Sequence, residues 1–186
     1  MATTKKGAEI DSNLQGAISR PPSRNRAQPE AVIFTGLQGA GKSTFYRERF
    51  FNTHLRLNLD MLRTRRREAL LFEACLAGKI SFVADNTNPT VEERARYIAP
   101  ARAAGYRISG YHFDITIAVC LKRNTARPTA ERVPPSGLYG TRKRLHPPTP
   151  DEGFNVLYRV SIGDGGGLIV EEWIPETDVK IARPPS

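Results

Sequence analysis

The sequence predicts an α/β fold with a mostly parallel central sheet. Short apolar runs rich in β-branched and aromatic residues, such as AVIFT at 31–35, alternate along the chain with longer segments of helical apolar spacing. Capping and turn residues separate these segments, and such alternation is typical of helices that cover a parallel sheet. The chain has 186 residues, of which 39% are hydrophobic and 25% charged, which is enough for one buried core without disulfides.

The first half of the chain is expected to form strands and helices in turn. They follow one another as strand 31–35, helix 42–50, strand 55–59, helix 61–77, strand 80–84 and a helix that ends near 104. Asp60 stands at the N-cap position before helix 61–77, and Gly78 takes the position just after its end. The last of these helices opens with a capping box of Thr90 and Glu93, and Pro100 is expected to kink it.

The second half of the chain continues the alternation and then changes character. Gly105 ends the preceding helix, and a strand at 106–113 and a helix at 115–125 follow it. Residues 127–153 are rich in Pro, Arg and Gly and are expected to be a long segment with one short helix near 137–145. Two strands, 154–162 and 168–173, flank a glycine-rich turn at 163–167.

We expect one domain at 30–175 between two tails. Residues 1–29 carry Ser, Asn, Gly and Pro and have no sustained apolar period, which is typical of a flexible basic tail. This tail is either a solvated leader or an arm that contacts nucleic acid. Residues 176–186 form the expected C-terminal tail.

The composition disfavours several classes of protein and favours anionic partners. The 28 Lys and Arg residues outnumber the 19 Asp and Glu residues, and the net charge of +9 favours nucleic acid, nucleotides or acidic surfaces. No apolar run approaches the roughly 20 residues of a membrane span, and the N-terminus lacks the apolar stretch of a secretory signal. Cys75 and Cys120 lack the spacing of a zinc site, so we expect no structural metal and a reducing compartment, the cytoplasm or, in a eukaryote, the nucleus.

A glycine-bearing loop between the first strand and the first helix carries the first specific motif. Residues 36–43 read GLQGAGKS and fit the pattern G-x-x-x-x-G-K-[ST] without a mismatch. Glycines let the backbone curl so that several N–H groups point into one cavity, and the helix N-terminus adds partial positive charge. Lys42 can reach the β- and γ-phosphates of ATP, and the Ser43 hydroxyl can bind Mg²⁺. The residues expected to hold the nucleotide are Gly36, Gly39, Ala40, Gly41, Lys42, Ser43 and Thr44.

The loop alone does not identify the phosphate acceptor. GTPases, motor ATPases and small kinases share it, and an ordinary glycine-rich turn is a further alternative. The guanine-reading pattern N-K-x-D is absent, which disfavours a GTPase, and a remodelling ATPase usually has a longer chain. The size therefore favours a compact kinase.

A kinase that phosphorylates a hydroxyl needs a base near that oxygen and positive charge around the moving phosphoryl group. Asp60 follows a predicted strand, at the edge where α/β sheets bind ligands, and Arg63 follows one helical turn later. Both residues can face one cleft, with Asp60 as the general base. Alternatively, Asp60 only caps its helix and Arg63 is solvated.

A second acidic residue follows another predicted strand. Asp85 ends the strand at 80–84, where its carboxylate can support Mg²⁺ through water. The turn after it offers short polar groups that either line a pocket or form a structural Asx turn: Asn86, Thr87 and Asn88.

Several arginines are candidates for binding phosphates. Arg123 and Arg127 are four residues apart near a predicted helix end, so they are either lid arginines that close over the phosphates or a solvated helix end. The basic runs 65–67 and 142–144 are candidates for an acidic substrate track, although such runs are more often solvated faces.

Together these segments resemble the 5′-hydroxyl polynucleotide kinase family, chiefly the kinase half of animal polynucleotide kinase-phosphatases and, more loosely, phage polynucleotide kinase. The segments occur in the family's order and cover most of residues 31–173. They are GLQGAGKSTF (36–45), LNLDMLR (57–63), ADNTNPTVEERARYIAPARAAG (84–105), KRNTAR (122–127) and LYGTRKRLHPPTPDEGF (138–154). The DNTNP stretch and the PPT-x-x-EGF segment are more specific than the phosphate loop.

The resemblance implies a three-layer P-loop fold with an arginine-bearing lid over about 123–137, and it implies catalytic roles for Lys42, Asp60 and Arg127. By matching position, Lys42 would hold phosphates, Ser43 would ligate Mg²⁺ and Asp60 would be the general base. Arg63 would contact the phosphate of the acceptor, and Arg123 and Arg127 would be the lid arginines. The acceptor pocket would be lined by Asp85, Asn86, Thr87 and Asn88.

The expected function is therefore an ATP- and Mg²⁺-dependent kinase that phosphorylates a 5′-hydroxyl end of DNA or RNA. The phosphatase pattern D-x-D-x-[TV] is absent, so we expect no 3′-phosphatase activity. The short, proline-rich stretch 128–137 leaves a kinase of a small alcohol as the alternative, and an ATP-binding protein without phosphate transfer as a third.

Overall fold

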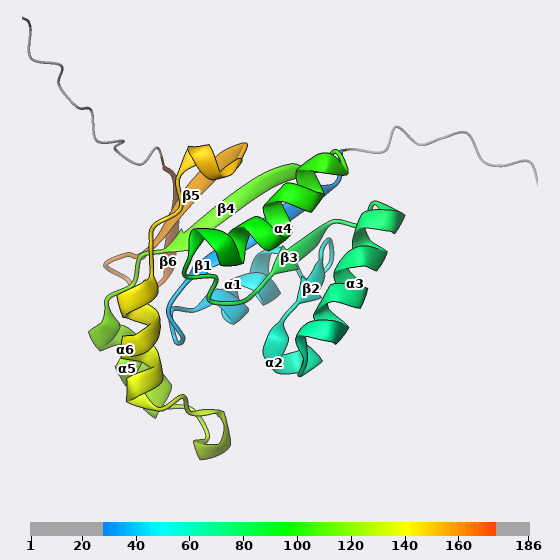
Figure 1. The fold of residues 1–186 in the computed structure, drawn as a ribbon. Coiled ribbons are helices and arrows are strands. Elements are labelled where there is room, and N and C mark those ends of the chain that lie inside the picture. The colour runs from blue at the N-terminus through cyan, green and yellow to red at the C-terminus, as the bar shows by residue number, and fades with distance from the viewer. Residues whose placement is uncertain (1–27, 174–186) are drawn as a thin grey trace, which may run out of the picture.

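The computed structural model describes residues 28–173, which form a central sheet covered by helices (Figure 1). The sheet has six strands in the order β2-β3-β1-β4-β5-β6. The strands are β1 (Glu30–Gly36), β2 (Leu55–Leu57), β3 (Phe82–Ala84), β4 (Arg107–Phe113), β5 (Val156–Ile162) and β6 (Leu168–Glu172). All neighbouring strands are parallel except β5 and β6, which pair antiparallel. The predicted mostly parallel α/β sheet is thus confirmed.

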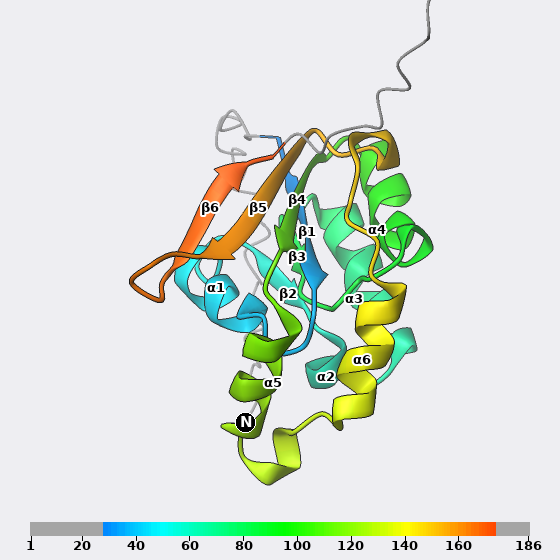
Figure 2. The ribbon, with the colours of Figure 1, turned by 90° about the vertical axis from the view of Figure 1, so that its left-hand side faces the viewer.

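Six α-helices and two short 3₁₀ helices connect the described strands. They are α1 (Lys42–Arg49), α2 (Leu59–Leu62), α3 (Arg65–Gly78), α4 (Val91–Ala103), α5 (Ile117–Thr125), η1 (Thr129–Glu131), α6 (Pro135–Arg144) and η2 (Pro150–Glu152). Helices α3 and α4 cover one face of the sheet, and α1 and α5 lie on the other (Figure 2). The chain therefore has three layers, and α6 lies beside α5.

The alternation of side chains along β1 divides the core into two clusters. Ala31 and Ile33 pack on the side of α3 and α4, with Cys75 and Tyr97. Val32 and Phe34 pack on the side of α1 and α5, where an aromatic group gathers: Phe34, Phe45, Phe50 and Phe113. Because β1 is apolar on both faces, it is the buried central strand expected of a parallel sheet.

The predicted helix 61–77 is wrong at its start, because the structure splits it into α2 and α3. Asn58, not Asp60, caps α2, and its side chain accepts a hydrogen bond from the Met61 N–H at 3.0 Å. Arg63 then takes a left-handed conformation with φ 69°, and Thr64 caps α3 through the Arg67 N–H. Asn58 and Thr64 are both good cap residues, so they start two helices where one was expected.

Most other boundaries agree with the sequence. The Thr90 side chain accepts from the Glu93 N–H, which is one of the two hydrogen bonds of the predicted capping box, whereas the Glu93 carboxylate accepts from Arg144; the turn at 163–167 joins β5 to β6. Gly78 is a small correction: it is the last residue of α3, and Lys79 takes the left-handed position after it, with φ 53°. The predicted tails at 1–29 and 176–186 lie almost wholly outside the described residues.

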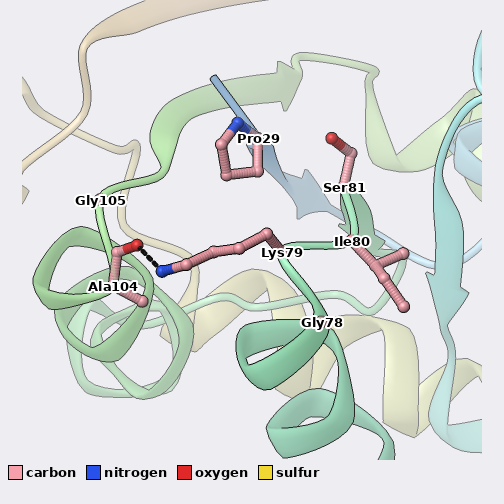
Figure 3. A pocket seen from close by; sticks show the side chains of 7 residues that line it. All are labelled: Pro29, Gly78, Lys79, Ile80, Ser81, Ala104 and Gly105. Carbon is pink, nitrogen blue, oxygen red and sulfur yellow. Dashed lines mark hydrogen bonds between the residues drawn. The ribbon is translucent and has the colours of Figure 1, made fainter. Parts of the chain in front are cut away.

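A cavity of about 380 Å³ lies at the amino ends of the strands (Figure 3). It is lined by Pro29, Gly78, Lys79, Ile80, Ser81, Ala104 and Gly105. The Lys79 ammonium donates to the Ala104 carbonyl oxygen at 2.5 Å, so its charge is already satisfied. This cavity is at the opposite sheet edge from the glycine loop, because the loop follows the carboxyl end of β1.

Candidate functional site

The loop 36–43 joins the carboxyl end of β1 to the amino end of α1, as the motif predicts. Gly39 has φ +82°, and a Cβ at this position would lie 2.7 Å from the Cys120 carbonyl oxygen of α5. Gly41 has φ +102° and forms the N-cap of α1. Glycine is therefore required for the tight curl of the loop, which aims backbone N–H groups toward an anion.

Lys42 is buried in the loop. Its ammonium donates to the carbonyl oxygens of Gly36 at 2.8 Å and of Leu37 at 2.6 Å. Burial lowers the pKa of Lys42 to about 8, although the Asp85 carboxylate opposes this shift. Smaller charge effects on the same pKa come from Arg127 and Asp60, so both of these predicted residues lie within electrostatic range of Lys42.

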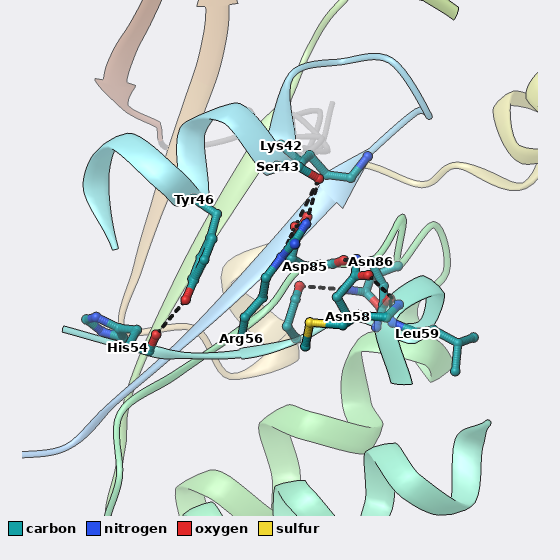
Figure 4. Close-up of polar contacts among 12 residues, drawn as sticks. Lys42, Ser43, Tyr46, His54, Arg56, Asn58, Leu59, Asp85 and Asn86 are labelled. Carbon is teal, nitrogen blue, oxygen red and sulfur yellow. Dashed lines mark hydrogen bonds and ion pairs between the residues drawn. The ribbon is translucent and has the colours of Figure 1, made fainter. Parts of the chain in front are cut away.

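Ser43, Asp85 and Arg56 meet directly beside the loop (Figure 4). The Ser43 hydroxyl donates to Asp85 Oδ2 at 3.1 Å, and Arg56 Nε donates to the same oxygen at 2.8 Å. Arg56 Nη2 also reaches Ser43 Oγ at 2.8 Å. The structure thus brings together the two residues that were each expected to support Mg²⁺, and both oxygen atoms contact the Arg56 guanidinium.

Arg56 is a site residue that the sequence reasoning missed. It lies on β2 between two apolar neighbours, Leu55 and Leu57, and its guanidinium packs over the Tyr46 ring at 5.3 Å from the centroid. The period-2 alternation of a strand places Arg56 on the opposite face from Leu57. A charged residue in the middle of a short predicted strand was the available signal.

Asn86 links the turn after β3 to three helices. Its Oδ1 accepts from the Leu59 N–H at 2.9 Å, and its Nδ2 donates to Glu68 at 2.7 Å and to the Tyr97 hydroxyl at 3.1 Å. Burial and the Glu68 carboxylate raise the pKa of Tyr97. The network joins the turn after β3 to α2, α3 and α4, so it holds α2 against the sheet edge.

Asp60 and Arg63 lie at the surface of α2 and at its end. The Asp60 carboxylate has no hydrogen bond or ion pair with any residue in the range 28–173. Asn58, the N-cap of α2, positions this helix, because its Nδ2 donates to the Asp85 carbonyl oxygen at 2.6 Å. The structure therefore presents a solvent-exposed carboxylate on a helix that is tied to the residue beside the glycine loop.

Thr87 and Asn88 have roles in the backbone of the turn. The Thr87 carbonyl oxygen accepts from the Gly36 N–H at 3.0 Å, which links the turn to the glycine loop. Asn88 is buried, and its Nδ2 donates to the carbonyl oxygens of Phe34 at 2.9 Å and of Ala84 at 3.3 Å. The Asn88 amide therefore faces β1 and β3, and its side chain is buried and does not line an open pocket.

The predicted lid spans the end of α5, η1 and the start of α6. Arg123 Nη1 lies 3.5 Å from the Ala40 carbonyl oxygen, so this arginine contacts the glycine loop. Arg127 is half-buried, and its carbonyl oxygen accepts from Arg132 Nε at 2.7 Å. Asn124 closes the base of the segment by two hydrogen bonds to the Val133 backbone. Arg123 thus borders the loop, whereas no hydrogen bond among the described residues joins the Arg127 side chain to it.

A buried ion pair between α4 and η2 connects the turn after β3 to the segment after α6. Arg94 is fully buried and binds both carboxylate oxygens of Glu152, each at 2.6 Å. Its Nη1 also donates to the carbonyl oxygens of Asn88 and His146. The sequence did not predict the ion pair of Arg94 and Glu152. The two residues are 58 positions apart, and no local pattern around either one indicates the other.

The two basic runs are only partly free. Arg65 pairs with Glu68 at 2.7 Å and Arg144 with Glu93 at 3.1 Å. The remaining members, Arg66, Arg67, Arg142 and Lys143, are exposed. Among the residues that the structure describes, no helix is long and apolar enough to cross a membrane, and no group of three or more His, Cys, Asp and Glu could hold a metal ion.

The comparisons with known proteins agree with this geometry. The family model AAA_33, an AAA domain, matches residues 32–148. A bifunctional polynucleotide phosphatase/kinase from Schizosaccharomyces pombe is 28% identical over 135 residues, which cover 70% of this chain but 33% of that relative. The chain thus spans about a third of the length of this relative.

Two solved structures share the fold. The AvrRxo1-ORF1:-ORF2 structure with ATP has a TM-score of 0.59 and 12% identity, and the match covers 81% of this chain and 61% of that one. The crystal structure of a fungal RNA kinase has a TM-score of 0.54 and 16% identity, with 72% and 38% covered. The chain therefore belongs to the AAA_33 family of P-loop kinase domains, and its sequence is similar to that of a polynucleotide kinase.

Proposed function

We propose that this P-loop kinase transfers the γ-phosphate of ATP to a 5′-hydroxyl end of DNA or RNA. The observation that carries the proposal is the position of Asp60: an exposed carboxylate on a helix anchored to Asp85, within electrostatic range of Lys42. The similarity to a polynucleotide phosphatase/kinase and the fold shared with a fungal RNA kinase support the acceptor class. The net charge of +9 suits a polyanionic substrate.

The site's own residues divide the work of an in-line transfer. The acceptor oxygen forms a bond to the γ-phosphorus while the bond to the ADP oxygen breaks, and Asp60 takes the hydroxyl proton. Lys42, Arg123 and Arg127 stabilise the negative charge that spreads over the phosphoryl oxygens. Arg63, next to Asp60, would contact the acceptor's own phosphate, with Asn86 and Thr87 at the rim of the same turn.

Ser43 and Asp85 fit a magnesium ion that accompanies ATP. They offer hard oxygen atoms close together, since Ser43 Oγ lies 3.1 Å from Asp85 Oδ2. Ser43 would hold the ion directly and Asp85 through water. When bound, the ion would neutralise charge on the β- and γ-phosphates.

Phosphate transfer from γ-labelled ATP to a panel of acceptors tests the proposal. The panel contains 5′-hydroxyl DNA and RNA oligonucleotides, the same oligonucleotides already phosphorylated at the 5′ end, and a set of small alcohols. We expect label only on the 5′-hydroxyl oligonucleotides. Transfer to a small alcohol alone would instead favour a metabolite kinase, and nucleotide binding without any labelled product would overturn phosphate transfer.

A further inference from the structure

Arg56 occupies the position between Ser43 and Asp85 where the proposed metal site lies. Its Nη2 contacts both Ser43 Oγ at 2.8 Å and Asp85 Oδ2 at 2.5 Å, and its Nε contacts Asp85 Oδ2 at 2.8 Å. One guanidinium therefore fills the space between the Ser43 and Asp85 oxygen atoms, where the proposed ion and the water that links it to Asp85 would lie. We propose that Arg56 is a built-in counter-cation, which holds the Ser43–Asp85 pair in the nucleotide-free protein and must leave before a divalent cation can enter.

The burial of Asp85 explains why such a counter-cation is needed. The Asp85 side chain is 1% exposed, and a carboxylate removed from water is costly unless a positive charge is close to it. Lys42 is a second cation whose charge acts on Asp85, but its ammonium is directed to the carbonyl oxygens of Gly36 and Leu37. Arg56 therefore supplies the direct ion pair.

The same contacts make Arg56 and a divalent cation mutually exclusive. A metal ion on Ser43 Oγ would lie within a few ångströms of Arg56, whose Nη2 is 2.8 Å from the same oxygen, so the two positive charges would repel each other. The guanidinium must consequently withdraw from the oxygen atoms as the ion binds. The energy of the Arg56–Asp85 pair is then lost, which weakens the affinity for the metal.

Arg56 is placed so that it can withdraw. It extends from β2, which is an edge strand of the sheet, and its side chain is 25% exposed. The Tyr46 ring lies 5.3 Å from the guanidinium carbon and provides a surface over which the charge can move toward solvent. Asp85, in contrast, has no such freedom.

The affinity of the nucleotide-free protein for Mn²⁺, measured by electron paramagnetic resonance, tests this role. Arg56→Gln should tighten Mn²⁺ binding by about 10-fold to 100-fold, the range that neighbouring groups commonly exert on a metal site. Arg56→Lys, which keeps the charge but not the fork of donors, should fall between Arg56→Gln and the wild type. Arg47→Gln is the matched control, because it removes the same charge from an exposed position on α1.

A second measurement separates Arg56 from the nucleotide itself. We expect Arg56→Gln to lower the Mg²⁺ concentration at which a fluorescent ADP analogue binds half-maximally, without weakening ADP binding in the absence of metal. Equal weakening with and without Mg²⁺ would show instead that Arg56 binds phosphate, and it would overturn the proposed role.

The role of Arg56 rests on the metal site of the proposed function. The experiment must therefore distinguish a wrong role for Arg56 from a wrong metal site. If Ser43→Ala weakens Mn²⁺ binding but Arg56→Gln leaves it unchanged, the metal site stands and the counter-cation role is wrong. If Ser43→Ala and Asp85→Asn both bind Mn²⁺ as the wild type does, the metal site itself is wrong. Thermal unfolding of each variant verifies that it is folded before it is titrated.

Discussion

Two carboxylates at the same edge of the sheet lie in opposite surroundings. Asp85 is buried and accepts hydrogen bonds from Ser43 and Arg56, whereas Asp60 is exposed and has no partner among residues 28–173. A buried carboxylate that accepts several hydrogen bonds is fixed in position, which suits a ligand of a cation. An exposed carboxylate is open to an incoming hydroxyl, which suits a base. The same type of side chain would thus serve the two proposed purposes because its neighbours differ.

The largest expected effect tests the proposed role of Asp60, the exposed carboxylate of this comparison. Asp60→Asn removes the proposed proton acceptor, so transfer to a 5′-hydroxyl oligonucleotide should fall by about 10²-fold to 10⁴-fold. Affinity for ADP should stay unchanged, because Asp60 lies outside the glycine loop. Glu73→Gln, an exposed charge in the middle of α3, is the control and should retain wild-type transfer.

The second effect concerns the buried ion pair of Arg94 and Glu152, which supports the turn after β3. Arg94→Met leaves the Glu152 carboxylate without its partner, so it should lower the free energy of unfolding by about 3–5 kcal/mol. The double variant Arg94→Met/Glu152→Met removes both charges and should recover a large part of that loss. Urea unfolding measures both. A double variant no more stable than the single one would show that the carbonyl contacts of Arg94, not the ion pair, hold the segment.

A smaller effect concerns Lys42 in the glycine loop, and it is measured as the pH dependence of nucleotide binding. Burial lowers the pKa of Lys42 to about 8, so the ammonium is charged below this pH and loses its proton as the pH rises through it. Nucleotide affinity should therefore be constant below pH 8 and fall by up to about tenfold per pH unit above it. Fluorescent ADP titrations from pH 7 to 9.5 measure the decline. Lys42→Met should bind more weakly and show no such decline; a decline that persists in this variant would assign it to another group.

The smallest effect compares the two basic runs. The exposed Arg66 and Arg67 lie on α3, which follows the helix that carries Asp60, whereas Arg142 and Lys143 lie on α6 behind the lid. Neutralising Arg66 and Arg67 should raise the KM for an oligonucleotide a few-fold and reduce its salt dependence, with the slope changing by about 1 per lost phosphate contact. If only the Arg142→Gln/Lys143→Gln variant changes KM, the strand runs past α6 instead.

The glycine loop and the alternation of elements were predictable because both are local. A strand, GLQGAGKS and a helix are contiguous, and the cap residue Thr90 acts on a neighbour three positions away. The start of helix 61–77 was not, because Asn58 and Thr64 lie six residues apart and each caps a helix of its own. Asn58 also donates to the Asp85 carbonyl oxygen, which favours a helix start at this point.

The acceptor side was predictable as a group of residues but not as a network. Asp60 and Asp85 follow strands that end at the same sheet edge, which a parallel topology implies. The ion pair of Arg56 with Asp85 and that of Arg94 with Glu152 join elements 29 and 58 residues apart. No periodicity in the sequence indicates such partners. The ion pair with Arg56 is also what distinguishes the surroundings of the buried Asp85 carboxylate from those of the exposed Asp60 carboxylate.

Single-turnover transfer at varied Mg²⁺ concentration tests the division between these two carboxylates most directly. Wild type, Asp60→Asn and Asp85→Asn are each mixed with γ-labelled ATP and a 5′-hydroxyl oligonucleotide, and the rate is followed as Mg²⁺ is raised. We predict that the defect of Asp85→Asn shrinks as Mg²⁺ increases, whereas the defect of Asp60→Asn is the same at every Mg²⁺ concentration. A defect of Asp60→Asn that Mg²⁺ relieves, or an Asp60→Asn rate equal to that of the wild type, would contradict the account.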